Sequence, residues 1–456
     1  MIKQDDIIEL EIEKVIFEGI GLSKHNGIAV FVKGVLPDEK IKAKVLKVNK
    51  NFIKAELVEI LTPSKFRIKP ICPMSKPCGA CNLAFVDYDY STQLKEKIVL
   101  EIFDKFKNTK ILPFIKSENH LEYRHKTQYP TTQTKNSKRI LIGYYKEKTH
   151  EIVNIKYCPI QKSIIDKIVD FTRENWTLGA YEEKNHKGLL RHINTRISNY
   201  NNDILVTFVL NTDKKELTKI ENKLNLFKDE LIKNFPQIKG VLINLNNEKT
   251  NKIIGEETVL LYGDDFIFEK LTDGINEFTY KIGSNSFFQV NINCANLLFG
   301  AAKKLIAKKG TLLDLYGGVG TIGIFMKDVS TKITLVEENK EAIKLAKENF
   351  KLNEILKYEI FESDANKKMK DFIKEKKSFE NIIIDPPRKG SDNETLDLIS
   401  KMTNSIVYIS CNPMTLKRDS EILIEKGFKF KSVQGVDMFP HTHHIECVAH
   451  FEREQK

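Results

Sequence analysis

The sequence contains no long hydrophobic run and no compositionally biased tract. No segment approaches the about 18 consecutive apolar residues that a membrane-spanning helix requires. The first residues, Met1 to Asp6, lack the apolar segment of a signal peptide. No proline-rich or glutamine-rich stretch marks a disordered region, and no internal repeat is present. These absences predict a globular, cytoplasmic protein that has no membrane partner.

The chain has enough length for several domains and an excess of basic residues. With 456 residues, of which 41% are hydrophobic and 30% charged, it is expected to form about three domains. The net charge of +11 favours a polyanionic partner such as nucleic acid, although a lysine-rich composition also arises from genomic bias. Residues 41–69 carry eight Lys or Arg against two Glu, which predicts either a basic binding face or a solvated strand face.

The seven cysteines are not expected to form disulfides in a reducing compartment, so their spacing is informative. Four of the cysteines are predicted to form one shared thiolate site: Cys72, Cys78, Cys81 and Cys158. Such a set can hold zinc or a four-iron four-sulfur cluster, and spacing alone does not choose between them. The Cys-x3-Cys-x2-Cys run of radical S-adenosylmethionine enzymes is absent. A cluster with four protein ligands has no open iron, so a structural or RNA-binding role is expected. Cys294 and Cys447 are expected in the core.

Three regions differ in their patterns. Residues 1–62 carry short alternating segments broken by glycines, which predicts a small β-barrel. Residues 63–284 hold the four cysteines, mixed strand signals and an amphipathic helix from Leu217 to Leu231, which predicts an α+β domain. Residues 285–456 alternate strand and helix signals, and this pattern predicts a parallel, doubly wound α/β sheet.

The strand ends of the third region carry a predicted cofactor site. A glycine-rich segment at 314–323 follows a strand and opens a helix, but NAD enzymes and plain tight turns share this feature. The next strand ends at Glu337, where a carboxylate can accept hydrogen bonds from ribose hydroxyls. Later strand ends carry Asp364, which could contact an adenine amino group, and Asp385. Together these positions suit S-adenosylmethionine, whereas helix capping is the alternative for each Asp alone.

Cys411 is the candidate nucleophile. It follows the apolar strand at 405–409 and precedes an Asn-Pro turn, a position that faces the ligand crevice of an open sheet. A lone cysteine is more often inert core, so its neighbours matter. The Asp385-Pro-Pro-Arg388 segment is similar to the Asp-Pro-Pro-aromatic motif of amino-methyltransferases, but arginine replaces the ring. This departure favours a ring carbon as target, and uracil C5 becomes nucleophilic once a thiolate adds to C6.

Glu446 is the candidate base for the C5 proton. Its apolar neighbours are expected to raise the pKa of its carboxyl group toward neutrality. Three histidines precede it: His441, His443 and His444. They lack an adjoining cysteine pattern, so we expect them to line a polar cleft or contact phosphate rather than bind a metal.

Together these motifs resemble the RNA 5-methyluridine (uracil-C5) methyltransferases over almost the whole chain. Residues 17–21 and 31–37 are similar to the TRAM domain, an OB-like RNA-binding barrel. The resemblance implies a Rossmann-like S-adenosylmethionine-dependent methyltransferase domain, preceded by the TRAM barrel and by a central α+β domain. It also implies that the four cysteines of that central domain hold an iron-sulfur cluster rather than zinc.

The same resemblance implies individual roles. The expected cofactor contacts are Gln289, Tyr316, Thr321, Glu337, Asp364 and Asp385. Cys411 is the implied nucleophile and Glu446 the implied proton acceptor. Phe287 or Phe288 is expected to stack on the flipped base. The chain departs from many members at Gly317, where they have cysteine; that position is not the nucleophile.

The implied function is that of a 23S rRNA (uracil-C5)-methyltransferase. The tRNA T-loop is the alternative substrate, and because minimal bacterial tRNA enzymes of the family lack the barrel and the cluster, the N-terminal half is expected to discriminate. A non-catalytic RNA-binding protein is the alternative of another class, against which Cys411, Asp385 and Glu446 argue. An iron-sulfur electron-transfer protein is disfavoured because no second redox motif is present. We expect a monomer, since the enzyme must wrap an RNA loop.

Overall fold

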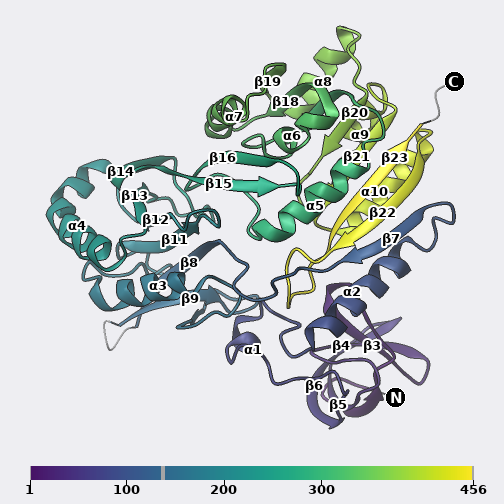
Figure 1. The fold of residues 1–456 in the computed structure, drawn as a ribbon. Helices are drawn as coiled ribbons and strands as arrows, with labels where there is room; N and C mark the ends of the chain where they lie inside the picture. The colour runs from purple at the N-terminus through teal and green to yellow at the C-terminus, as the bar shows by residue number, and fades with distance from the viewer. Residues whose placement is uncertain (1, 135–138, 454–456) are drawn as a thin grey trace.

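The computed structural model describes residues 2–134 and 139–453 and shows three lobes (Figure 1). The N-terminal strands form one lobe, a sheet with two long helices forms the second, and a larger sheet with helices forms the third. In the described part of the chain, no helix is long and apolar enough to cross a membrane.

The first lobe is all-β, as its alternating pattern predicts. Six strands pair in the order β1-β5-β6-β4-β3-β2: β1 (Ile7–Glu11), β2 (Lys14–Ile16), β3 (Ile20–His25), β4 (Ile28–Lys33), β5 (Lys40–Val48) and β6 (Phe52–Thr62). Inward residues such as Val30, Ile41 and Ile53 are fully buried. A short 3-10 helix, η1 (Phe17–Gly19), links β2 to β3. Lys42 and Lys44 pair with Glu59 and Asp5, so these two lysines of the basic segment lie on a neutralised strand face.

The second lobe contains a seven-stranded sheet ordered β10-β9-β8-β11-β12-β13-β14. Its strands are β8 (Lys126–Gln133), β9 (Ile140–Tyr145), β10 (Ile152–Asn154), β11 (Leu190–Ile197), β12 (Ile204–Leu210), β13 (Ile238–Leu245) and β14 (Glu257–Gly263). Helices α3 (Ser163–Asn175) and α4 (Lys214–Asn234) cover one face. The predicted amphipathic helix is confirmed, because Leu224 and Leu231 of α4 are buried against this sheet.

The third lobe is built on an eight-stranded sheet ordered β19-β18-β17-β20-β21-β23-β22-β7. Its strands are β17 (Gly310–Leu315), β18 (Ser330–Glu337), β19 (Tyr358–Glu362), β20 (Asn381–Ile384), β21 (Ser405–Ser410), β22 (Lys429–Val436) and β23 (Glu446–Glu452), besides β7. The strands from β19 to β21 run parallel, which confirms the predicted doubly wound sheet. The alternating helices are α6 (Thr321–Phe325), α7 (Lys340–Leu352), α8 (Ala365–Lys374), α9 (Asn393–Ser400) and α10 (Pro413–Glu425).

Two segments from the predicted central region pack on the third lobe. Strand β7 (Lys110–Ile115) pairs in parallel with β22, and α2 (Tyr88–Phe103) packs against α10. The short helix α1 (Ser75–Cys78) precedes them in the cysteine segment. The hairpin of β15 (Phe266–Thr272) and β16 (Glu277–Gly283) packs on α5 (Ile292–Lys304) and α7. The lobes therefore interleave in sequence, and α2 and β7 lie outside the sheet of the second lobe.

Candidate functional site

A tight glycine turn joins β17 to α6. Gly318 and Gly320 have φ of 55° and 86°, the left-handed region that glycine adopts without strain. Tyr316 has φ of 62°, which is uncommon for a residue with a side chain. At Gly317 a Cβ atom would lie 2.5 Å from Leu335 Cγ, so glycine fits the close packing of this turn against β18. The backbone is thereby open to a ligand at the carboxyl end of β17.

The side chain of Asp314, on β17, stabilises this turn. Its Oδ2 accepts a hydrogen bond from the Gly323 N–H at 2.8 Å, and its Oδ1 has no protein partner in the described structure. Burial raises the pKa of this carboxyl group to about 7. Sequence reasoning did not assign Asp314 a role, although it begins the glycine-rich motif.

Glu337 lies at the end of β18 and is fixed by backbone amides. Its Oε2 accepts the Gly318 N–H at 3.0 Å, and its Oε1 accepts the N–H groups of Glu338 and Asn339 at 2.9 Å each. Oε1 thereby uses both of its lone-pair sites, whereas Oε2 retains one site for a further donor. A carboxylate held at a strand end in this way can accept hydrogen bonds from neighbouring hydroxyl groups.

The other predicted cofactor residues lie at or near the same edge. Tyr316 follows β17, and its hydroxyl interacts with Thr395 of α9. Thr321 opens α6, and its carbonyl accepts the Tyr280 hydroxyl at 3.0 Å. Asp364 caps α8 by accepting the Lys367 N–H at 2.9 Å, which is the helix capping expected as the alternative to cofactor binding.

Cys411 and Glu446 meet at the ends of β21 and β23. These strands are antiparallel, and their last register pair joins Ser410 to Cys447. The residues one step further, Cys411 and Glu446, therefore lie at the same level. Cys411 is half-buried, whereas Glu446 is only 5% exposed. The sheet thus brings together two residues that are 35 positions apart in the printed sequence.

Burial and charge perturb both groups. Burial, assisted by the negative charges of Glu446 and Asp385, raises the pKa of the Cys411 thiol to about 11. Burial, assisted by Asp385, raises the pKa of Glu446 to about 8. Asp385 follows β20, and burial raises its pKa to about 7. Three acidic groups thus share one poorly solvated edge, an arrangement typical of functional sites.

Arg388 is the positive charge of this group. It is exposed, yet it lowers the pKa values of both Cys411 and Glu446 against the effect of burial. The Asp-Pro-Pro-Arg motif contained this residue, but sequence reasoning treated it only as a departure from an aromatic ring. The structure identifies it as the cation that favours the ionised forms of the thiol and the carboxyl group.

The two candidate stacking residues differ in exposure. Phe288 is 2% exposed and packs on Tyr280 with ring centroids 5.5 Å apart, whereas Phe287 is 71% exposed. Phe288 is therefore a core residue, and of the pair only Phe287 presents a ring to a partner. The next residue, Gln289, is half-buried in the irregular segment between β16 and α5.

The segment that carries Phe287 is anchored by the second lobe. The Ser286 carbonyl accepts hydrogen bonds from the side chains of Lys126 and Arg196, and the Val290 carbonyl accepts the His125 N–H at 2.9 Å. No local pattern predicts this anchoring, because it joins residues more than 80 positions apart.

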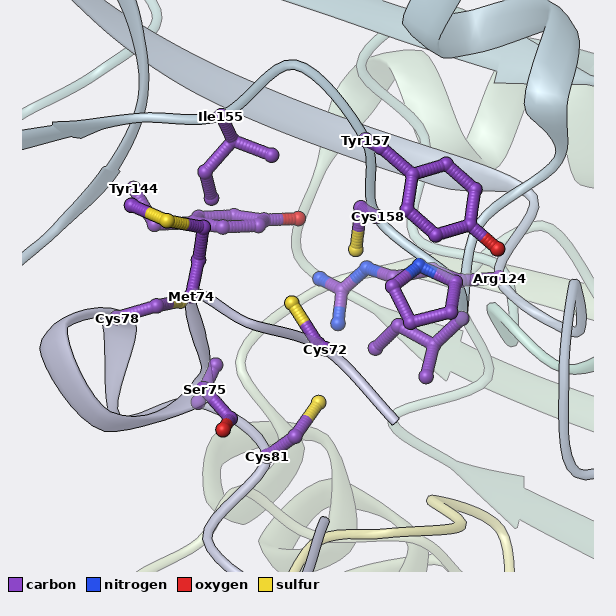
Figure 2. Close-up of a pocket in the computed structure, with 13 residues that line it drawn as sticks. Cys72, Met74, Ser75, Cys78, Cys81, Arg124, Tyr144, Ile155, Tyr157 and Cys158 are labelled. Carbon is purple, nitrogen blue, oxygen red and sulfur yellow. The ribbon is translucent and has the colours of Figure 1, made fainter. Parts of the chain in front are cut away.

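The four predicted thiolate ligands line one cavity. Its volume is about 220 Å³, and Cys72, Cys78, Cys81 and Cys158 lie on its wall (Figure 2). The Arg124 guanidinium points into the same space among the sulfur atoms. Burial and the neighbouring thiols raise the pKa of Cys81 to about 12, and burial raises that of Cys158 to about 12. Within residues 2–134 and 139–453, no group of three or more His, Cys, Asp or Glu is arranged to hold a metal ion.

The remaining cysteines and the histidines are accounted for by packing. Cys294 and Cys447 are buried, as predicted. His441 is 1% exposed and hydrogen-bonds His120 at 3.0 Å, so it does not reach a phosphate in this arrangement. His443 contacts Asn82.

Comparisons with known proteins agree with this architecture. The sequence model described as tRNA (uracil-5-)-methyltransferase matches residues 87–454, and the TRAM model matches residues 5–58. An uncharacterized RNA methyltransferase of Oceanobacillus iheyensis is 37% identical over 98% of this chain and 97% of its own length. Another, from Clostridium acetobutylicum, is 34% identical over 100% of this chain and 99% of its own length.

A solved structure extends the similarity to three dimensions. The crystal structure of Pyrococcus abyssi tRNA (uracil-54, C5)-methyltransferase in complex with S-adenosyl-L-homocysteine has a TM-score of 0.75 and 25% sequence identity. The similarity covers 97% of this chain and 100% of that one. The chain therefore belongs to the tRNA (uracil-5-)-methyltransferase family of S-adenosylmethionine-dependent RNA methyltransferases, and it carries an N-terminal TRAM domain.

Proposed function

We propose that this enzyme methylates C5 of a uridine in RNA through a covalent bond between Cys411 and C6. The observation that carries the proposal is the placement of Cys411 and Glu446 at the same level of two paired strands, beside Asp385 and Arg388. A nucleophile and a base at one strand edge match the two demands of this reaction.

The catalytic residues act one after another in the proposed reaction. The Cys411 thiolate adds to C6, and the electron pair of the C5–C6 bond moves to make C5 nucleophilic. S-Adenosylmethionine, when bound, would supply an electrophilic methyl group; as C5 bonds to that carbon, the S–CH3 bond would break and S-adenosylhomocysteine would leave. The Glu446 carboxylate then accepts the proton from C5, the C5–C6 double bond forms again, and the Cys411 thiolate leaves. Arg388 stabilises the anionic form of Cys411 before addition and after elimination.

The cofactor is proposed to bind across the carboxyl ends of β17, β18 and β20. The contacts that we assign to it are Gln289, Tyr316, Thr321, Glu337, Asp364 and Asp385. Support comes from the open glycine turn and from the oriented Glu337 carboxylate. A Phe287 ring exposed on a segment anchored by Lys126 and Arg196 supports stacking on a flipped base.

Replacing Glu337 with Ala is expected to weaken cofactor binding. The charged hydrogen bonds lost are worth about 1.5–3 kcal/mol, or roughly a 10- to 100-fold rise in Kd. Isothermal titration calorimetry with S-adenosylhomocysteine measures this change. Glu338→Ala, at the exposed neighbouring position, is the matched control and should leave Kd unchanged; equal weakening in both variants would refute the assignment.

Replacing Arg388 with Met is expected to move the pH profile to higher pH. Both Cys411 and Glu446 act as anions, and their pKa values are already raised by burial, so the wild-type rate should increase with pH through about 8. Loss of the nearby cation removes an interaction that lowers both pKa values, so both rise further. Single-turnover methylation at saturating RNA, measured from about pH 6.5 to 9.5, tests the shift. Lys389→Met removes an adjacent exposed charge and should leave the profile in place.

We further propose that Cys72, Cys78, Cys81 and Cys158 hold a four-iron four-sulfur cluster. Four thiols on the wall of one cavity provide the donor set of such a cluster, and the Arg124 guanidinium offsets the negative charge that thiolates would bring. A fully ligated cluster supplies no open iron, so its proposed role is to order the surrounding segments. Zinc, the alternative, would need its four ligands around a single ion.

The proposed substrate is 23S rRNA, with tRNA as the second candidate. The rRNA assignment rests on the family resemblance of the sequence motifs, and the TRAM domain and the four-cysteine cavity are compatible with either RNA. The N-terminal half of the chain does not distinguish rRNA enzymes from tRNA enzymes as expected, because a tRNA uridine-54 enzyme of Pyrococcus abyssi aligns with 97% of this chain. That similarity is the observation that favours tRNA.

Nucleoside mass spectrometry tests reaction and substrate together. Separated 23S rRNA and tRNA, both unmodified, are incubated with the purified protein and labelled S-adenosylmethionine. Labelled 5-methyluridine in 23S rRNA is the expected result. Label in tRNA alone would support the proposed reaction but change the assigned substrate to tRNA. Label in neither RNA would refute the proposal.

A further inference from the structure

The loop between β22 and β23, residues 437–445, leads directly into Glu446. In Figure 1 this loop (yellow) extends away from its sheet toward the N-terminal part of the chain. Glu446 is the first residue of β23 and pairs with Val436 of β22, so its position depends on this strand pairing and on the path of the loop that enters it. The contacts of the loop therefore bear on the position of the proposed base.

The first set of contacts comes from the residues that follow Cys81. The Leu83 N–H donates to the His441 carbonyl at 2.9 Å, and the His443 N–H donates to Asn82 Oδ1 at 2.8 Å. The Asn82 side-chain nitrogen also hydrogen-bonds His443 Nδ1. His441 has φ of 63°, an uncommon conformation that persists only where surrounding contacts maintain it. One ligand segment of the cysteine cavity thus holds this bend.

A second contact comes from Tyr123, which directly precedes the cavity residue Arg124. The Tyr123 hydroxyl donates to the Pro440 carbonyl at 3.1 Å, and Tyr123 is 3% exposed. The next residue, Arg124, extends its guanidinium into the space among the four thiols (Figure 2). Both segments that hold residues 440–443 are therefore continuous with the cysteine cavity.

The start of the loop has its own anchor. Buried Lys95 of α2 pairs with Asp437 and donates to the Phe439 carbonyl at 3.2 Å. The barrel contributes Phe17, whose ring meets the edge of the His443 ring at a centroid distance of 6.4 Å. With one end fixed by Lys95, the part of the loop nearer to Glu446 is held by Asn82, Leu83 and Tyr123, together with the hydrogen bond between His120 and His441.

We propose that the cysteine site positions Glu446 through Asn82 and Tyr123, so that an ordered site is required for removal of the C5 proton. This inference rests on the proposed function. Asn82 and Tyr123 act on Glu446 through the loop and are positioning residues. When the loop is displaced, Cys411 still adds to C6 and C5 still takes the methyl group, but the C5 proton has no acceptor. The Cys411–C6 bond then persists, and methylated RNA stays attached to the protein.

Two readouts on the full chain, purified without oxygen, test the proposal. Asn82→Ala and Tyr123→Phe should raise amide hydrogen exchange in residues 439–446 about tenfold, the scale of one lost hydrogen bond. In reactions with labelled S-adenosylmethionine, both should release product about tenfold more slowly than wild type while forming the covalent adduct within twofold of its rate. Asn82→Asp keeps the acceptor for the His443 N–H and should restore part of the release rate.

Two further variants test whether the effect is specific to the loop and whether it originates in the cysteine site. Asn175→Ala, at the exposed end of α3, is the matched control and should change neither readout. Cys72→Ser alters the cavity without touching the loop and should raise exchange in residues 439–446 as Asn82→Ala does. Unchanged exchange in Cys72→Ser would overturn the link to the cysteine site, and equal loss of adduct formation and release in Asn82→Ala would overturn the positioning of Glu446. Failure of the proposed function itself differs from both, because wild type would then form neither adduct nor 5-methyluridine.

Discussion

Cys411→Ala is expected to abolish methylation while leaving cofactor binding intact. The thiol is the only group at the end of β21 that we assign to attack on C6, and without that bond C5 is not nucleophilic enough to take a methyl group. Loss of a covalent nucleophile typically lowers turnover by on the order of 10⁴-fold or more. The measurement is incorporation of labelled methyl groups into RNA at saturating substrate.

The Cys411→Ala variant can be checked for a loss of folding separately from its loss of methylation. Cys411 is half-buried at a strand end, so its truncation leaves a small space at the sheet edge rather than in the core. The variant should therefore keep its melting temperature within a few degrees and bind S-adenosylhomocysteine as wild type does. Methylation at a wild-type rate in this variant would exclude the covalent mechanism.

The third lobe could be predicted because local patterns specify it. Continuous apolar strands such as 382–384 and 405–409 are typical of a parallel sheet with both faces covered, and the glycine turn fixes where the cofactor edge lies. Cys411 and Glu446 were identified by residue type and motif. Their proximity follows from the antiparallel pairing of β21 with β23, which no local pattern specifies.

The features that could not be predicted depend on long-range pairing. Strand β7 has an ordinary strand pattern, but its choice of β22 as partner joins segments more than 300 residues apart. Likewise, Phe287 and Phe288 are adjacent and chemically alike, and only packing against Tyr280 distinguishes them. Arg388 was visible as a motif residue, but its electrostatic effect on two acidic groups depends on the folded sheet edge.

Glu446→Gln is expected to stop turnover after methyl transfer. Glutamine preserves the size and polarity of the side chain but cannot accept a proton, and a general base commonly contributes 10²- to 10⁴-fold. Addition of Cys411 to C6 and methyl uptake at C5 do not need this base, so each enzyme molecule should process one uridine and remain bonded to it. A slowly migrating band that carries the methyl label on a denaturing gel measures this adduct.

The adduct also distinguishes the two possible roles of Glu446. If the carboxyl group acted earlier, by removing the proton of the Cys411 thiol, Glu446→Gln would form no adduct and would resemble Cys411→Ala. The electrostatics argue against that role, because the negative charge of Glu446 raises the pKa of the thiol and opposes its ionisation. With a pKa of about 8, Glu446 is largely neutral near pH 7, so neutral glutamine changes the charge beside the thiol little and adduct formation at that pH should be about as fast as in wild type. Accumulation of adduct at an undiminished rate, with release reduced at least about 100-fold, is therefore the result that assigns Glu446 to the C5 proton.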